Sequence, residues 1–194
     1  FAFARRAALR PGETVLVLGS AGGVGTAAIQ IAKAMGARVI AVVHRAAAMD
    51  FVRSLEPDAV LGLADGWARA VLEATEGRGV DVVVDPVGGA AFDDAVRTLA
   101  PDGRLLVIGF AAGAIPTVKV NRLLLRNAGV LGVGYAEYIN KDPASAAVFA
   151  DGLAALVTAG LNPPAPVRFP LSKAADALRL LDSGGVYGKL VLEP

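Results

Sequence analysis

The stretch Gly19-Ser20-Ala21-Gly22-Gly23-Val24-Gly25 decides which fold this chain can adopt. It lies between an apolar run that ends at Gly19 and a segment, Gly25–Met35, whose apolar residues recur at helical spacing. Glycines in a turn between a strand and a helix let a pyrophosphate reach the backbone, where free amides and the helix dipole favour negative charge. A second apolar run ends at Val43, about 20 residues later, as in a dinucleotide-binding strand–helix–strand unit. We therefore predict a dinucleotide site at this turn, rather than a tight turn that binds nothing.

The rest of the chain repeats this alternation of strand-like and helix-like segments. The strand-like runs are apolar on both faces, which is typical of buried parallel strands. We predict an α/β fold of the Rossmann type, a doubly wound parallel sheet of six strands. The expected strands are Val15–Gly19, Arg38–Val43, Ala59–Leu61, Val80–Asp85, Arg104–Gly109 and Val130–Gly134. The expected helices between them are Gly25–Met35, Ala46–Leu55, Trp67–Thr75 and Ala90–Leu99.

The pattern changes after Gly134. One longer helix is expected over Pro143–Ala159, and three prolines between residues 163 and 166 then mark a boundary. Beyond it we expect a strand, a helix and a strand, at Val167–Phe169, Lys173–Asp182 and Lys189–Leu192. These elements are too few to enclose a core of their own. We therefore predict a dinucleotide-binding domain over residues 11–162 and a short piece of a second domain over residues 163–194.

Length, composition and charge exclude several classes of protein. The chain has 194 residues, of which 55% are hydrophobic and 19% are charged, and this composition excludes a disordered chain. Nineteen Lys and Arg residues balance 18 Asp and Glu residues without a basic run, so nucleic acid and anionic membranes are not expected as partners.

Cysteine is absent and His44 is the single histidine, so no metal site is predicted in these residues. The longest uncharged stretch, Thr14–Ala32, carries four glycines in its middle and is not expected to cross a membrane. The chain opens on Phe1 without a charged and then apolar leader, and we expect a cytoplasmic protein that is part of a longer one.

The end of the second predicted strand bears on the coenzyme. An acidic residue at this point binds the ribose 2′-hydroxyl of NAD and repels a 2′-phosphate. Here Val43 is followed by His44 and Arg45, and the nearest carboxylate is Asp50. A guanidinium can hold a phosphate through two parallel hydrogen bonds, so we predict NADPH rather than NADH. The alternative is that His44 and Arg45 are solvated surface residues.

Two more loops follow predicted strands at the same edge of the sheet, where ligands bind in this class of fold. They are Asp85-Pro86-Val87-Gly88-Gly89 and Ile108-Gly109-Phe110-Ala111-Ala112-Gly113. Their glycines leave the main chain open to a ribose and a nicotinamide, and Val87 and Phe110 offer apolar surface to the ring. Asp85 could act as a general base, but its place before a proline favours a role in forming the turn.

Five motifs in one order resemble a known family over essentially the whole chain. They are residues 11–17 (Pro-Gly-Glu-Thr-Val-Leu-Val), the glycine turn, residues 85–89, residues 103–110 (Gly-Arg-Leu-Leu-Val-Ile-Gly-Phe) and residues 188–192 (Gly-Lys-Leu-Val-Leu). This set is similar to the medium-chain dehydrogenase/reductase superfamily, and in particular to its zinc-independent NADPH:quinone oxidoreductase branch.

The resemblance implies a domain arrangement. In this family a GroES-like substrate domain precedes the nucleotide-binding domain, and the chain returns to it at its C-terminus. Residues 1–10 are then the connecting helix, and residues 163–194 are the returning segment. The substrate cleft lies between the two domains, so most residues that contact substrate are expected outside this sequence. The family also implies a homodimer that pairs through the edge strand at Val130–Gly134.

The resemblance also implies which residues bind the coenzyme. The pyrophosphate loop corresponds to Ser20, Ala21, Gly22, Gly23 and Val24, the 2′-phosphate region to His44 and Arg45, and the ribose and nicotinamide region to Val87, Gly109, Phe110, Ala111, Val133 and Gly134. The sequence departs from the family pattern at Glu56-Pro57, where Gly-Ala is usual, and at Gly62-Leu63, where Asn-Tyr is usual. The second change removes a polar contact near the adenosine.

The activity implied is hydride transfer from NADPH to a quinone or another conjugated carbonyl, which needs no metal because the acceptor itself draws the hydride. We assign no catalytic residue, and we expect Tyr135, Tyr138 and Tyr187 to serve packing. Two alternatives stay open. The chain is a nucleotide-binding module for sensing or interaction that has no turnover, or it is the cofactor domain of a zinc-dependent alcohol dehydrogenase.

Overall fold

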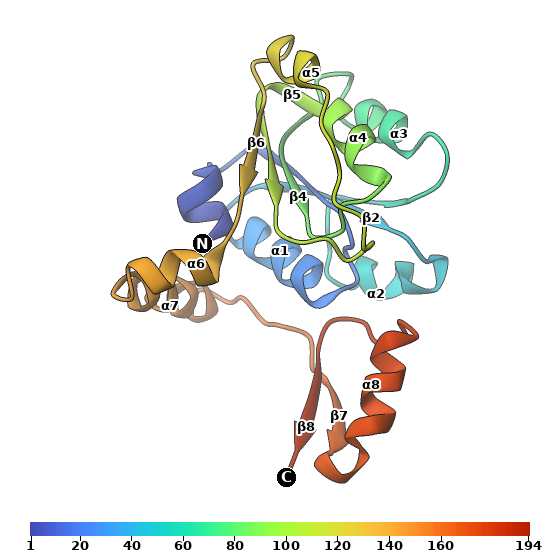
Figure 1. Cartoon of the computed structure of the whole chain (residues 1–194), viewed down its shortest axis with the longest axis vertical. Helices are drawn as coiled ribbons and strands as arrows, with labels where there is room; N and C mark the ends of the chain where they lie inside the picture. Colours follow the sequence, from blue (N-terminus) through green and yellow to red (C-terminus); the bar gives the residue numbers. More distant parts are fainter.

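The computed structural model describes all 194 residues and is built around one parallel sheet of six strands in the order β3-β2-β1-β4-β5-β6 (Figure 1). The strands are β1 (Thr14–Val17), β2 (Arg38–Val43), β3 (Ala59–Gly62), β4 (Val80–Asp85), β5 (Leu99–Val107) and β6 (Gly129–Gly132). The order turns back between β1 and β4, and such a switch point places a crevice at the carboxyl ends of the strands. The predicted Rossmann sheet is confirmed.

Side chains of each strand point alternately to two hydrophobic cores, one on each face of the sheet. Val15 and Val17 of β1 are buried against α1 (Gly23–Ala34), α2 (Met49–Arg53) and the N-terminal helical turn η1 (Ala2–Ala7). Leu16 of the same strand is buried on the opposite face, where α3 (Trp67–Ala74) and α4 (Ala91–Arg97) pack. Burial on both faces explains why this strand carries no polar side chain between Val15 and Val17.

Three parts of the sheet region differ from the sequence-based expectation. The helix expected to reach Leu99 ends at Arg97, because Leu99 already pairs with Val80 of β4 before an irregularity in the register. Two short helices, α5 (Val120–Leu124) and α6 (Tyr135–Lys141), were not predicted. Neither contains a buried residue, so neither produces a clear apolar period. A short turn, η2 (Ala46–Ala48), leads into α2.

Two arginines join the N-terminal turn η1 to the sheet, and one of them is Arg6, whose Nε donates to the carbonyl oxygen of Gly132 on β6 at 2.8 Å. Nε of Arg104 on β5 donates to the carbonyl oxygen of Ala7 at 2.9 Å. Its two terminal nitrogens contact the carboxylate of Glu13, each at 2.7 Å. Both side chains of this ion pair are largely buried, which fixes the segment before β1 against β5.

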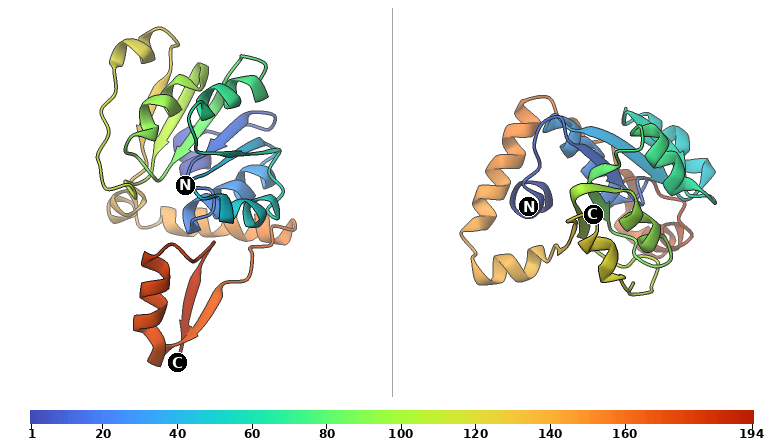
Figure 2. Two further views of the ribbon diagram at one scale, coloured as in Figure 1. Left: turned by 90° about the vertical axis from the view of Figure 1, so that its right-hand side faces the viewer. Right: turned by 90° about the horizontal axis from the view of Figure 1, so that it is seen from above.

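The C-terminal segment forms a separate small unit below the sheet (Figures 1 and 2). Helix α7 (Ser145–Thr158) has no buried residue, and an extended linker leads from it to β7 (Val167–Pro170), η3 (Leu171–Lys173), α8 (Ala174–Asp182) and β8 (Leu190–Glu193). Strands β7 and β8 pair in parallel with each other alone. Only Ala177 and Val186 are buried in this unit. No helix of the chain combines the length and apolar character needed to cross a membrane.

Candidate functional site

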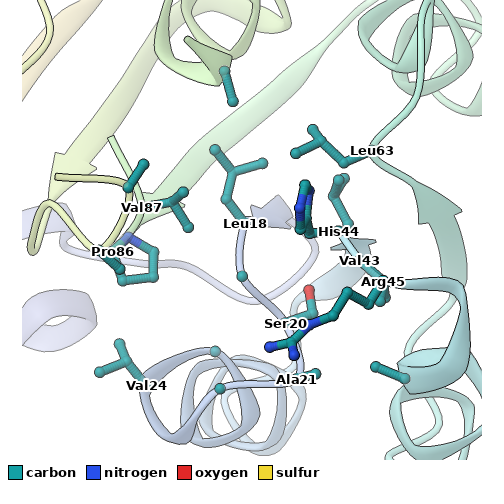
Figure 3. A pocket seen from close by; sticks show the side chains of 18 of the residues that line it. Leu18, Ser20, Ala21, Val24, Val43, His44, Arg45, Leu63, Pro86 and Val87 are labelled. Carbon is teal, nitrogen blue, oxygen red and sulfur yellow. The ribbon is translucent and has the colours of Figure 1, made fainter. Parts of the chain in front are cut away.

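A cavity of about 710 Å³ opens at the carboxyl ends of β1, β2 and β4, at the switch point of the sheet (Figure 3). Six segments line it: the glycine turn after β1, the end of β2, the residue after β3, the loop after β4, the loop after β5 and the stretch before β8. The lining residues include Gly19, Ser20, Ala21, Gly22, Gly23, Val24, Gly25, His44, Arg45, Leu63, Pro86, Val87, Gly88, Ala111, Ala112, Val186 and Tyr187. No Asp or Glu is among the residues that line it.

The turn after β1 is shaped by glycines that no other residue could replace without movement. Gly19 has a φ of +59°, and a Cβ at this position would lie 2.8 Å from Cγ2 of Val87. A Cβ on Gly25 would overlap the backbone, lying 2.7 Å from Cα of Ser20 and closer still to the carbonyl of Gly19. The turn therefore packs its backbone against the start of α1 and leaves one side open to the cavity.

The start of α1 presents backbone amides to this opening. The first main-chain hydrogen bond of the helix runs from Thr26 N–H to the carbonyl of Gly22, so the amides just before Thr26 have no partner one turn back. The hydroxyl of Ser20 donates to the carbonyl of Val17 at 2.8 Å and is fully buried. Ser20 therefore stabilises the turn with its side chain, and its amide donates to the carbonyl oxygen of Val42 at 3.3 Å. This arrangement suits a diphosphate.

His44 and Arg45 follow β2 and reach the cavity from its other side (Figure 3). Leu63, after β3, lies beside them. The guanidinium of Arg45 makes one hydrogen bond, from Nη1 to the carbonyl oxygen of Ser183 at 3.1 Å. The remaining N–H groups of Arg45 are available to an anion in the cavity.

Asp85 organises the loop after β4. One oxygen, Oδ1, accepts the backbone amides of Val87 and Gly88, both at 2.8 Å, while Oδ2 is buried without a partner. Burial raises the pKa of Asp85 above its ordinary value, more than these two hydrogen bonds lower it. Asp85 does not line the cavity. The structure thus gives it the turn-forming role that the sequence favoured over a general base.

The stretch before β8 enters the cavity although sequence reasoning did not place it there. The amide of Gly188 donates to the carbonyl of Ala21 at 2.8 Å, which fixes this stretch against the glycine turn. Val186 and Tyr187 then line the cavity. A Cβ on Gly23 would lie 2.9 Å from Nζ of Lys189, so this ammonium group is at the start of α1. The one available signal was the Gly188-Lys189 pair.

Nine of the predicted coenzyme-binding residues line this single cavity. They are Ser20, Ala21, Gly22, Gly23, Val24, His44, Arg45, Val87 and Ala111. The other four lie outside its lining. Phe110 is next to Gly88, and a Cβ at Gly88 would lie 3.1 Å from Cδ1 of Phe110. Gly109 lies close to the carbonyl oxygen of Pro86. Val133 donates its amide to Val107 in the sheet, and Gly134 precedes α6.

The sequence matches known proteins over most of its length. Residues 23–150 match the family described as zinc-binding dehydrogenase. Quinone oxidoreductase-like protein 2 of Bos taurus is 40% identical over 144 residues, which cover 71% of this chain and 40% of that protein. The same-named protein of Rattus norvegicus is 34% identical and covers 96% of this chain and 54% of that protein. The chain thus spans about half the length of these curated relatives.

A zinc site needs at least three His, Cys, Asp or Glu ligands close together. In this chain no three such side chains lie close enough to hold a metal ion. The residues of this chain therefore do not fit the zinc that the family is named for.

Solved structures agree with the sequence matches. A probable oxidoreductase from Mycobacterium abscessus superposes with a TM-score of 0.90 at 58% identity, covering 100% of this chain and 58% of that one. The mycobacterial protein Rv1454c, solved in complex with NADPH, superposes with a TM-score of 0.88 at 30% identity, covering 99% of this chain and 60% of that one. With the motifs, the sheet and the glycine-lined cavity, these matches show that the chain belongs to the zinc-binding dehydrogenase family, in the quinone oxidoreductase branch of the medium-chain dehydrogenase/reductase superfamily.

Proposed function

We propose that this chain is the NADPH-binding part of an oxidoreductase that transfers hydride to a quinone or another conjugated carbonyl. One observation carries the proposal: the cavity at the switch point combines a glycine turn with nearby cations and has no carboxylate in its lining. A dianionic diphosphate and an additional phosphate are favoured by such a site.

Each wall of the cavity has a role in this proposal. The glycine turn and the first amides of α1 receive the diphosphate, and Lys189 adds a positive charge beside Gly23. Arg45 receives the 2′-phosphate, with His44 and Leu63 beside the adenosine. Val87, Ala111 and Ala112 offer an apolar surface to the nicotinamide ring. Gly109, Phe110, Val133 and Gly134 stay predictions for the same end.

NADPH, when bound, supplies a hydride from its nicotinamide ring. The residues of this chain bind and orient the coenzyme, and the apolar wall at Val87 and Ala112 excludes water from one face of the ring. No acid or base in the cavity is needed for the hydride step, because a conjugated carbonyl draws the hydride itself. The proton that completes the reduction comes from water.

The acceptor is proposed to bind between this domain and a substrate domain that precedes residue 1, as the relatives' greater length supports. We also propose that two copies pair through β6. This strand has a free edge in the sheet, and Val120 and Leu124 of α5 are exposed by 72% and 77% in the preceding segment.

The coenzyme and the turnover are tested separately. In fluorescence titrations of the full chain, NADPH should bind at least about tenfold more tightly than NADH. This factor corresponds to the free energy of one hydrogen-bonded contact between a charged side chain and the phosphate. In the protein extended by its substrate domain, NADPH oxidation should follow addition of 1,4-benzoquinone or methyl vinyl ketone. Tight NADPH binding without oxidation across a panel of quinones and enones would instead identify a binding module without turnover.

A further inference from the structure

Coenzyme choice in this chain depends on more than the residue that meets the phosphate. Arg45 is an exposed side chain at the end of β2, and a long side chain in solvent has many rotamers. Binding a 2′-phosphate through two parallel N–H groups requires a single one of these rotamers. Whatever holds the guanidinium in place before the coenzyme arrives therefore contributes to the preference for NADPH.

The structure shows what holds it. Nη1 of Arg45 donates to the carbonyl oxygen of Ser183, the residue that follows α8, 138 positions further along the chain. A carbonyl uses one N–H of the guanidinium and leaves the others for a second acceptor. The side chain is thereby directed into the cavity (Figure 3).

The next residue, Gly184, makes this contact possible. A Cβ at Gly184 would overlap Nη1, Nη2 and Cζ of Arg45, so the guanidinium rests directly on the glycine backbone. Gly184 also has a φ of +72°, which turns the chain after α8 toward the cavity. Four residues later, Gly188 bonds to Ala21 of the glycine turn, so the stretch between them is tied at both ends.

We propose that Ser183 and Gly184 are positioning residues for coenzyme specificity: they hold the guanidinium of Arg45 where the 2′-phosphate of NADPH is received. This inference rests on the proposed function, and in particular on the NADPH preference. It assigns to the turn after α8, outside the cavity lining, the difference between NADPH and NADH.

The test is a substitution that moves the guanidinium without removing it. Gly184→Asn adds a Cβ in the place of the guanidinium, and asparagine tolerates a positive φ better than other residues do. In titrations of the full chain, Gly184→Asn and Gly184→Ala should each weaken NADPH binding about tenfold, the value of the lost phosphate contact, and leave NADH binding within about twofold. The NADPH-to-NADH affinity ratio is the readout, because a general loss of structure weakens both coenzymes alike.

Gly77→Ala is the matched control. Gly77 has a φ of +81°, and nothing lies within 4 Å of a Cβ built on it, so this variant has the same backbone strain without the contact. Its affinity ratio should equal that of the wild type. In the double variant with Arg45→Ala, Gly184→Asn should cause no further loss of NADPH affinity, because the group it displaces is gone.

The two levels of the proposal fail differently. If the wild type binds NADPH and NADH equally, the coenzyme preference is wrong and the inference falls with it. If the wild type prefers NADPH, Arg45→Ala abolishes the preference and both Gly184 variants keep it, then only the inference is overturned.

Discussion

Single glycines determine how closely the turn after β1 packs on the first helix. Gly25 is buried, and backbone atoms on the opposite side of the turn occupy the space that a side chain would need. Backbone cannot rotate away as a side chain can. Gly25, the last glycine of the motif, is therefore required by packing rather than by contact with a ligand.

Gly25→Ala should lower the free energy of unfolding by about 1–3 kcal/mol, the usual cost of forcing extra volume into a packed site. Gly152→Ala is the control, since Gly152 lies in α7 with nothing within 4 Å of a Cβ. Removing a glycine from an exposed helix should raise stability by up to about 1 kcal/mol. Urea unfolding followed by circular dichroism measures both, and a Gly25→Ala variant as stable as the wild type would contradict the packing argument.

At the scale of elements, β4 ends in a buried carboxylate, Asp85, whose protonation should affect the stability of the fold. Burial raises the pKa of Asp85 in the folded chain, so the folded chain holds this proton more tightly than the unfolded chain does. Asp85 therefore makes its full favourable contribution to the free energy of unfolding at pH values below its pKa in the unfolded chain. This contribution is lost as the pH rises through its pKa in the folded chain.

Asp85→Asn removes this dependence while keeping an oxygen that accepts the amides of Val87 and Gly88. The stability of the variant relative to the wild type should therefore increase as the pH rises above about 4, the ordinary pKa of an aspartate. Urea midpoints at several pH values measure it. Asp151→Asn, at an exposed position of α7, removes a charge without burial and should follow the wild type at every pH. If the difference in stability between Asp85→Asn and the wild type were also the same at every pH, this carboxylate would not titrate over the pH values measured.

Elements with a continuous apolar run or a clear helical spacing of apolar residues could be predicted from the sequence. Elements without such a pattern could not. Strand β2 was predicted with its observed ends because five consecutive buried residues follow Arg38. Helix α6 was missed because its side chains are not buried in the chain, so solvent rather than a core determines its pattern. The start of β5 was missed because Pro101 and Gly103 indicate a turn, while pairing of Leu99 with Val80 is a tertiary contact.

The cavity also has parts that could be predicted and parts that could not. The glycine turn after β1 could be predicted because strand, turn and helix are consecutive in the sequence. The contacts of Arg45 with Ser183 and of Lys189 with Gly23 join residues more than 130 positions apart, and no local pattern encodes them. The charge of Arg45 predicted an anion site at this position. The sequence did not predict which residues orient the guanidinium.

At the scale of the whole molecule, exposed apolar side chains lie in the segment that leads into the edge strand β6. Val120 and Leu124, one turn apart on α5, and Leu125 after it are each more than 70% exposed. Exposed apolar side chains on one short helix favour association with another copy.

Leu124→Glu should shift the chain from dimer to monomer, because the two-fold axis of a dimer places the new charge in the interface twice. Sedimentation equilibrium of the wild type should give twice the 19.6 kDa chain mass, and the variant should give one chain mass at the same concentration. Leu178→Glu, on α8 far from α5 (Figure 1), adds an equal charge at another exposed leucine and should remain dimeric. A monomeric wild type at high concentration would overturn the proposed pairing.

The bond from Gly188 to Ala21 also bears on the order in which this protein is made. Synthesis proceeds from the N-terminus, so all six strands of the sheet, complete at Gly132, leave the ribosome well before the stretch that closes the cavity. A ligand stabilises only a form that can bind it. The sheet is therefore complete before the residues that close the proposed coenzyme cavity are made, and a coenzyme in that cavity stabilises the chain only once synthesis has passed Gly188.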